Sequence, residues 1–196
     1  MEKPEDLFVG FDIGSDSIHY SVLNSNKNIV YSPKPIPHLA DPVQALKQAW
    51  KNITTKFNLE DIKNTAFTGS GSESFPEIMP GVTQEYDSVT IPKGAKIIEP
   101  DTEYIFHMGA KDAYFFSLAN INGMSIITEA RPSSKCGGGS GTLIAKQCNR
   151  LLESEVSQEE IFTKAEEMAR NSENPSKFLA RCGIVIQSDL IHKQNE

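Results

Sequence analysis

The 196-residue sequence predicts an α/β fold, and three observations support that prediction. Two stretches share one pattern, a strand and a small-residue turn followed by further strands. A long segment with apolar residues at helical spacing follows the first of these stretches. A glycine-rich loop that leads into another helical segment follows the second. Strand hairpins and helices that recur in this order are typical of an α/β protein.

Strands open the first half of the chain. Residues 7–13 alternate well enough in polarity to form a strand, and residues 18–23 predict a second one. A tight turn at 14–17 joins these two strands. A polar turn at 24–28 then leads to a third strand that begins at 29–31.

A helix follows the first strands. Residues 32–40 contain three prolines and form a connector. Asp41 is then a helix N-cap, and Pro42 occupies the first helical position. Apolar residues recur at helical spacing as far as Phe57, so we expect this helix to pack on the sheet with Trp50 in the core.

The middle of the chain is less regular. Residues 62–68 predict a short strand, which the sequence Gly-Ser-Gly-Ser at 69–72 ends. We expect a short helix or turn at 73–80 and an irregular segment at 82–92. Residues 95–98 fit either a strand or the end of a helix.

The second half begins as the first did. Strands are predicted at 104–106 and 113–118, with the glycine-containing segment 107–112 between them. Asn-Gly at 122–123 is a hairpin turn signal, and 124–128 predicts another strand.

A glycine-rich loop comes next, with four glycines in the five positions 137–141. Glycine loses too much backbone freedom inside a helix or strand, so this run is a loop that can approach a ligand with bare backbone. Apolar residues from Leu143 onward predict a helix, whose N-terminal N–H groups and dipole favour an anion. Cys136 stands at the mouth of the loop, where the helix terminus and Lys135 would both favour the thiolate.

The C-terminal part predicts further helices. Ser157–Glu160 forms a capping box that opens a helix to about Arg170. Residues 174–179 predict a turn or a short helix, and Ser188 is expected to cap a last helix. That helix is cut at Glu196 without a stop signal, so we expect the chain to be a fragment of a longer protein.

Composition narrows the possible functions. The formal net charge of -7 argues against nucleic acid as a partner. The sequence shows no signal peptide and no long apolar run, which predicts a cytoplasmic protein without a membrane span. Three cysteines, an odd number, indicate reduced thiols or a metal site rather than a disulfide framework.

Asp12 is the first candidate for chemistry. It ends the first strand and is followed by Ile13-Gly14-Ser15. Such a turn can hold a phosphate on backbone N–H groups while the carboxylate orients a hydrated Mg²⁺. The alternative is an aspartate that caps a hairpin. Two hairpins of this kind can also face each other across a cleft and grip one polyphosphate.

These features resemble a known superfamily, that of actin, sugar kinases and heat-shock chaperone ATPases. Asp12-Ile13-Gly14-Ser15 resembles its first phosphate loop, and residues 107–112 stand where the second would be. The segment Lys135–Gly141 resembles the Lys-Cys-Ala-Ala-Gly-Thr-Gly signature of the activators of 2-hydroxyacyl-CoA dehydratases and the related benzoyl-CoA reductase ATPases. Arg181–Asp189 resembles the second cysteine segment of that family, and the chain is similar to the N-terminal module of the large tandem-module activases.

The resemblance implies a fold and a mechanism. The fold would be actin-like (ribonuclease H-like), with a first subdomain at 1–68 and an incomplete second one at 69–196. In this family ATP, with Mg²⁺, drives a low-potential electron from a [4Fe–4S] cluster into a dehydratase or reductase-type iron–sulfur partner. A homodimer holds the cluster, with two cysteines from each chain.

Site residues follow from the same resemblance. Cys136 and Cys182 would be the cluster ligands, whereas Cys148 matches no ligand and is assigned to the core. Asp12 and Asp112 would be the catalytic residues. The nucleotide-binding residues would be Gly14, Ser15, Gly109, Ala110, Lys111, Gly138, Gly139, Ser140 and Gly141.

The second loop departs from the family pattern Asp-Ile-Gly-Gly-Gln-Asp. His107 replaces the first Asp, Ala110 the second Gly and Lys111 the Gln, while Gly109 and Asp112 remain. Neutral imidazole is a poorer Mg²⁺ ligand than a carboxylate, so hydrolysis of ATP is left open. Two alternatives therefore stand beside the activase: a degenerate regulatory or docking module that does not hydrolyse ATP, and a small-molecule kinase with Asp112 as its base.

Overall fold

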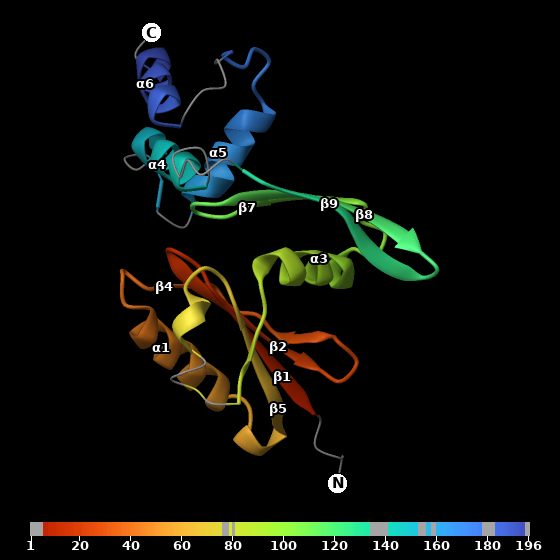
Figure 1. Cartoon of the computed structure of the whole chain (residues 1–196). Coiled ribbons are helices and arrows are strands. Elements are labelled where there is room, and N and C mark those ends of the chain that lie inside the picture. The colour runs from red at the N-terminus through yellow and green to blue at the C-terminus, as the bar shows by residue number, and fades with distance from the viewer. Residues whose placement is uncertain are drawn as a thin grey trace. The chain divides into compact units, whose positions relative to one another are not determined.

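The computed structural model describes residues 6–75, 79, 81–133, 141–152, 156–157, 160–177 and 183–194. The chain divides into two compact units, Met1–Ile105 with Ser117–Thr128 and Phe106–Phe116 with Glu129–Glu196 (Figure 1). Residues 69–105 belong to the first unit, and the subdomain boundary expected after Thr68 stays a prediction. Among the described residues, no helix is long and apolar enough to cross a membrane.

The elements of the first unit are six strands and two α-helices among the described residues. The strands are β1 (Leu7–Ile13), β2 (Ser17–Asn24), β3 (Ile29–Tyr31), β4 (Ile36–Pro37), β5 (Ile62–Thr68) and β6 (Thr83–Gln84). The helices are α1 (Pro42–Thr54) and α3 (Asp87–Ile98), with the 3-10 turns η1 (Leu59–Asp61) and η2 (Ser72–Ser74) between them.

A second sheet and three helices follow. The sheet has the order β7-β8-β9, formed by β7 (Tyr104–Met108), β8 (Ala113–Ile121) and β9 (Met124–Pro132). Each of these strands has residues in both units. The helices of the second unit are α4 (Gly141–Leu152), α5 (Ile161–Arg170) and α6 (Gly183–Gln194).

The first sheet has the order β3-β2-β1-β5-β6, and β4 pairs with β2. β1 and β2 form the predicted antiparallel hairpin, with register pairs from Leu7 opposite Asn24 to Ile13 opposite Ile18. β1 and β5 are parallel. Parallel neighbours need a crossover connection, which α1 provides.

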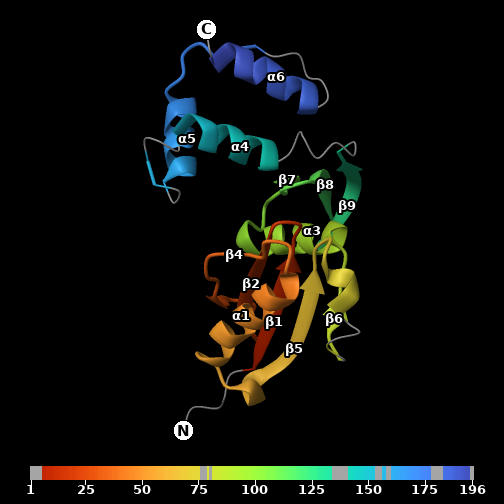
Figure 2. The same cartoon turned by 90° about the vertical axis from the view of Figure 1, so that its left-hand side faces the viewer.

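Helix α1 covers one face of this sheet (Figure 2). It begins as predicted, because the Asp41 carboxylate accepts the N–H of Gln44 at 3.0 Å and Pro42 is the first helical residue. Its buried residues pack against the alternate residues of β1 and β2 that face the same way. They are Ala45, Leu46, Ala49 and Ile53. Trp50 packs at the edge of this core, with its ring centroid 5.9 Å from that of Phe11.

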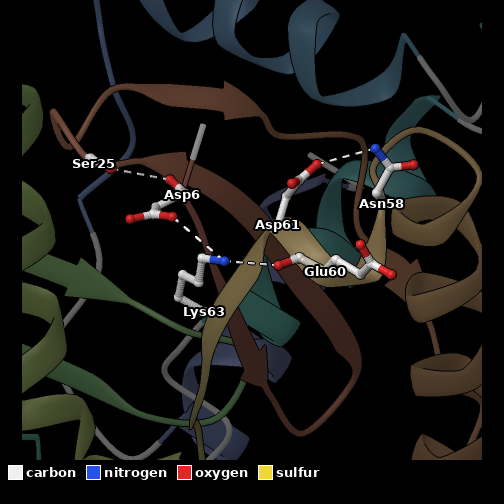
Figure 3. A network of polar contacts seen from close by, with 6 residues as sticks. All are labelled: Asp6, Ser25, Asn58, Glu60, Asp61 and Lys63. Carbon is white, nitrogen blue, oxygen red and sulfur yellow. Dashed lines mark hydrogen bonds and ion pairs between the residues drawn. The ribbon is translucent and has the colours of Figure 1, made fainter. Parts of the chain in front are cut away.

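Polar contacts connect the start of β1 with the start of β5 (Figure 3). The Lys63 ammonium lies 3.6 Å from the Asp6 carboxylate and donates to the Glu60 carbonyl at 2.9 Å. The Ser25 hydroxyl donates to the Asp6 carbonyl at 3.4 Å. These groups are exposed, so they contribute little to stability and mainly fix the local backbone.

The segment at 82–92 corrects our prediction. We expected it to be irregular, but Asp87–Ile98 is one helix, α3, which contains Pro92. Proline disfavours helix interiors because it has no N–H and its ring clashes with the preceding turn. Pro92 is nevertheless buried, and the Tyr86 carbonyl accepts the N–H groups of Val89 and Thr90. The burial of Pro92 therefore outweighs the unfavourable effect of proline on the helix.

The C-terminal helices correct a second prediction. α6 begins at Gly183, so Ser188 lies inside the helix and is not its cap. The helix expected after Ser157 is confirmed as α5 and ends at Arg170, but its N-cap is Glu160 without a side-chain cap bond, so the capping box predicted at Ser157–Glu160 does not open it. The Glu160 carboxylate accepts from the Ser157 hydroxyl at 2.7 Å and, more distantly, from its N–H at 3.4 Å. Serine in a helix interior costs only a fraction of a kcal/mol, so a serine alone does not mark a helix start.

Candidate functional site

The first candidate loop joins β1 to β2 in the first unit. Its backbone is fixed by hydrogen bonds, since the Gly14 N–H donates to the Ser17 carbonyl at 3.1 Å. His38, in the segment before α1, contacts the loop twice. Its backbone N–H donates to the Asp16 carbonyl at 3.1 Å, and its ring Nε2 lies 3.2 Å from the Gly14 carbonyl. The Gly14 N–H is thus already used. Ser15 makes no hydrogen bond to any described residue, so its N–H and hydroxyl are the loop groups left for a ligand.

Asp12 is positioned by the alternation of β1. Its neighbours Phe11 and Ile13 are buried against α1, so Asp12 points to the opposite face of the sheet and is half-buried there. In the sheet register it stands beside His19 of β2 and Thr68 of β5. Asp12 therefore ends a central strand at the loop that follows it, as the sequence predicted.

Gly69 allows the turn after β5 to lie against Asp12. Its φ of +92° is in the left-handed region that favours glycine. A methyl group at this position would lie 2.4 Å from Asp12 Oδ1 and 2.5 Å from the Ile13 carbonyl oxygen. The Gly71 N–H donates to that same carbonyl at 2.9 Å. The β5 turn is thus docked directly on the end of β1.

A second carboxylate, Asp87, meets the same turn. Its Oδ1 accepts the Gly69 N–H and the Thr68 hydroxyl, each at 2.8 Å. The Thr68 hydroxyl also lies 3.1 Å from that of Thr90. Our sequence analysis missed Asp87, because it did not recognise α3. An acidic residue in the first turn of a helix could have marked Asp87 as a helix-start residue, but not its contact with the Gly69 turn.

The second candidate loop joins β7 to β8 in the second unit. The Gly109 N–H donates to the Asp112 carbonyl at 2.8 Å, which closes a tight turn. Lys111 and Asp112 are exposed, and Ala110 is half-buried. Both predicted functional side chains of this loop, Lys111 and Asp112, are therefore accessible to a ligand.

The start of α4 is hydrogen bonded to this second loop. The Gly141 N–H donates to the Gly109 carbonyl at 2.9 Å, and the Thr142 N–H and hydroxyl both donate to the Ala110 carbonyl. A methyl group at Gly141 would lie 2.9 Å from the Gly109 carbonyl oxygen, so the close approach requires glycine. Two N–H groups at the start of the helix are thus used within the protein. The nucleotide role of Gly141 stays a prediction.

His107 lies beside the second loop. It is half-buried on β7, and its ring centroid is 6.3 Å from that of Tyr114. A methyl group at Gly109 would lie 3.4 Å from His107 Nε2, so the imidazole faces the loop backbone. This is the residue that replaces the aspartate of the family pattern.

The remaining predicted ligands fall outside the described residues. These are Cys136, Gly138, Gly139, Ser140 and Cys182. Cys148 is half-buried on α4 and lines an apolar groove with Leu143 and Met168, so it lies at the edge of the apolar packing and not in the fully buried core. Within the described ranges, no three His, Cys, Asp or Glu side chains come together as a metal site.

Comparison with solved structures decides the fold. The activator of 2-hydroxyisocaproyl-CoA dehydratase from Clostridium difficile, with bound ADPNP, superposes with a TM-score of 0.73 and 24% identity over 97% of this chain and 67% of its own. Component A of (R)-2-hydroxyglutaryl-CoA dehydratase from Acidaminococcus fermentans gives 0.74 and 21% over 97% and 68%. This chain has an actin-like fold.

A more distant solved structure shows the same actin-like fold. It is the ethanolamine utilization protein EutJ from Carboxydothermus hydrogenoformans, with a TM-score of 0.53 and 15% identity over 99% of this chain and 70% of that one. No family model matches the chain, and the search of curated proteins found no match. The actin-like fold predicted from the two hairpins is confirmed.

Proposed function

We propose that this chain is the ATP-binding module of an activator of 2-hydroxyacyl-CoA dehydratases or of a benzoyl-CoA reductase-type enzyme. The observation that carries the proposal is the likeness to two dehydratase activators over 97% of the chain, one of them with bound ADPNP. The two cysteine segments around Cys136 and Cys182 support the same family through their sequence.

Nucleotide binding is proposed for both hairpin loops. At the first loop, Ser15 would donate to a phosphate oxygen and the Asp12 carboxylate would orient hydrated Mg²⁺. Mg²⁺ prefers oxygen ligands and keeps several waters. The carboxylates of Asp12 and Asp87 beside the Gly69 turn could supply such oxygen ligands. At the second loop, the exposed Lys111 ammonium would contact phosphate.

Electron transfer is the finer part of the proposal. Cys136 and Cys182 would supply thiolate ligands, so that two chains in a homodimer hold one [4Fe–4S] cluster. Bound there, the cluster would supply a low-potential electron to the iron–sulfur partner enzyme. This assembly would work in the cytoplasm.

A non-hydrolysing module of the same family is the second candidate. His107 and Lys111 favour it, because the family has an aspartate and a glutamine at these positions. A module of this kind would bind ATP and dock or regulate a partner. His107→Asp separates the two candidates: ATP turnover that appears only in this variant would indicate that His107 had removed hydrolysis, whereas turnover by the unaltered chain would exclude the second candidate.

Binding of ADPNP with and without Mg²⁺, measured by calorimetry, tests the nucleotide site. Asp12→Asn should weaken Mg²⁺-dependent binding about tenfold or more, because a charged ligand of the cation is lost. Asp16→Asn is the matched control, since Asp16 is exposed in the same loop and the charge change is identical. Absence of ADPNP binding, or an equal effect of both variants, would overturn the proposed role of Asp12.

Anaerobic reconstitution with iron and sulfide tests the cluster. We expect about two iron atoms per chain and dimerisation. Both should be lost in Cys136→Ser and in Cys182→Ser. Cys148→Ser is the control and should retain both, because Cys148 belongs to the α4 groove. A folded sample that binds ADPNP but no iron would contradict the proposed cluster and would favour the non-hydrolysing module.

A further inference from the structure

A pocket of about 750 Å³ lies in the first unit, lined by the β2–β3 turn, α3 and parts of β8 and β9. These elements can be followed in Figure 1. The β1–β2 register puts the β2–β3 turn at the end of the sheet opposite the Asp12 loop, because Asn24 pairs with Leu7 and Ile18 with Ile13. The pocket lining therefore does not include the first phosphate loop, although Lys93 also lines a neighbouring pocket that reaches Asp12.

The pocket combines lysines with an apolar wall. Lys27, Lys93 and Lys96 line it, together with Leu118 and Ile127 among its apolar residues. Its lining contains no Asp or Glu, although the chain has 26 acidic and 19 basic residues. Ligand pockets typically have this size and combine apolar walls with a few convergent polar groups.

The three lysines have no carboxylate partner in the described part of the chain. Each ion pair found there involves other residues. The Lys96 ammonium donates to the Pro100 carbonyl at 2.7 Å, which leaves its charge uncompensated. Three ammonium groups around one pocket raise the local concentration of anions.

The β2–β3 turn holds Lys27 in a defined position. The buried Asn24 side chain accepts the N–H groups of Asn26 at 3.1 Å and Asn28 at 3.0 Å, and the Lys27 N–H donates to the Asn24 carbonyl at 2.9 Å. Lys27 itself adopts a φ of +63°. With the Asn24 N–H donating to the Asn28 carbonyl at 3.0 Å, four hydrogen bonds fix this turn, so binding at Lys27 has little further backbone ordering to pay.

We propose that this pocket binds a small amphipathic organic anion, one that carries a phosphate, sulfonate or carboxylate on an apolar body. The lysines would bind the anionic group. Leu118, Ile127 and the apolar part of α3 would pack on the body. This site is additional to the proposed nucleotide site.

Two fluorescent dyes test the pocket on the whole chain. The anionic probe is 8-anilinonaphthalene-1-sulfonate, and N-phenyl-1-naphthylamine has the same apolar body without the charge. The anionic dye should bind saturably with one equivalent and weaken as salt is added. Lys27→Gln and Lys93→Gln should each weaken it about fivefold, while the neutral dye should be unaffected. Lys47→Gln, at an exposed position of α1, is the matched control.

Acetylation gives a second readout that does not depend on variants. Bound anionic dye should slow the acetylation of Lys27, Lys93 and Lys96, measured by mass spectrometry, and leave that of Lys47 unchanged. The proposal is overturned if Lys27→Gln and Lys93→Gln bind the anionic dye as well as the unaltered chain does. Displacement of the dye by ADPNP would also overturn it, because the pocket would then belong to the nucleotide site.

Discussion

Among the described glycines of the first unit, Gly69 leaves the least room for a side chain. A side chain there would collide with Asp12 Oδ1 and with the Ile13 carbonyl, in addition to straining a left-handed backbone. We expect Gly69→Ala to lower the free energy of unfolding by about 3 kcal/mol or more, measured by urea denaturation. The same change should weaken ADPNP binding, because it displaces the Asp12 carboxylate.

Gly81→Ala is the matched control for this prediction. Gly81 has a similar φ of +89°, but a methyl group there would have no atom of the described residues within 4 Å. Its cost should be that of the backbone alone, about 1 kcal/mol. Equal losses in the two variants would show that the contact with Asp12 is unimportant.

Tyr20 makes stability depend on alkaline pH. Burial raises the pKa of its phenol, and the hydrogen bond from the Asn52 amide at 2.7 Å lowers it only in part. A raised pKa in the folded state stabilises the fold fully below about pH 10, and this contribution is lost as the pH rises through the raised value. Tyr20→Phe should therefore flatten the decline in unfolding free energy above about pH 10. Tyr86→Phe, at an exposed position, should follow the unaltered protein.

Asp12 and Asp87 differ in whether the sequence alone could point to them. Asp12 could be proposed as a site residue because the signal for it lies in the residues next to it in the sequence. Asp87 acts on Gly69 and Thr68, which lie 18 and 19 positions away. Only the folded chain brings them together, so local patterns do not reveal the contact.

The Asp41 side chain caps the N-terminus of helix α1. Asp41→Ala removes the oxygen that accepts the Gln44 N–H and should destabilise the protein by about 1 kcal/mol, seen as a lower urea midpoint. Asp41→Asn keeps a capping oxygen and should be nearly neutral. A loss in Asp41→Asn as large as in Asp41→Ala would mean that the charge matters and the hydrogen bond does not.

The elements that the sequence predicted share strong local signals. β1 and β2 alternate in polarity, and α1 has a cap, an N-terminal proline and helical spacing. α3 lacks a side-chain cap and contains Pro92, so its helical state depends on burial against the rest of the unit. α6 begins at a glycine, a weak helix former, and has no capping signal that the sequence could have shown.

Nucleotide binding should stabilise the whole molecule. A ligand at one hundred times its Kd adds about 2.7 kcal/mol to the free energy of unfolding, which corresponds to a rise of about 5–10 °C in Tm for a chain of this length. We expect this rise with ADPNP and Mg²⁺ in a thermal unfolding experiment, and a smaller one when EDTA removes the metal. An unchanged Tm at saturating nucleotide would contradict the proposed function.

At the scale of the whole molecule, the two hairpins together with the resemblance of the loops and the cysteine segments to a known family predicted the fold correctly. The hydrogen bonding of the candidate site was harder to predict from the sequence than the fold. The loop sequences pointed to Asp12 and the 107–112 segment as candidate site residues. They did not show that the N–H groups of Gly14, Gly141 and Thr142 are hydrogen-bonded within the protein. Hydrogen-bond partners of this kind depend on which loops meet in the fold.

The bonds from Gly141 and Thr142 to the second loop form a mechanical linkage. The Gly109 and Ala110 carbonyls accept from three donors at the first turn of α4, so we expect a displacement of the loop to displace this turn as well. The cysteine segment 135–140 is joined covalently to that turn. Under the proposed function, a phosphate that shifts the second loop would also displace the first turn of α4. Hydrogen exchange at the start of α4 should slow when ADPNP is added, and Thr142→Val should reduce that response.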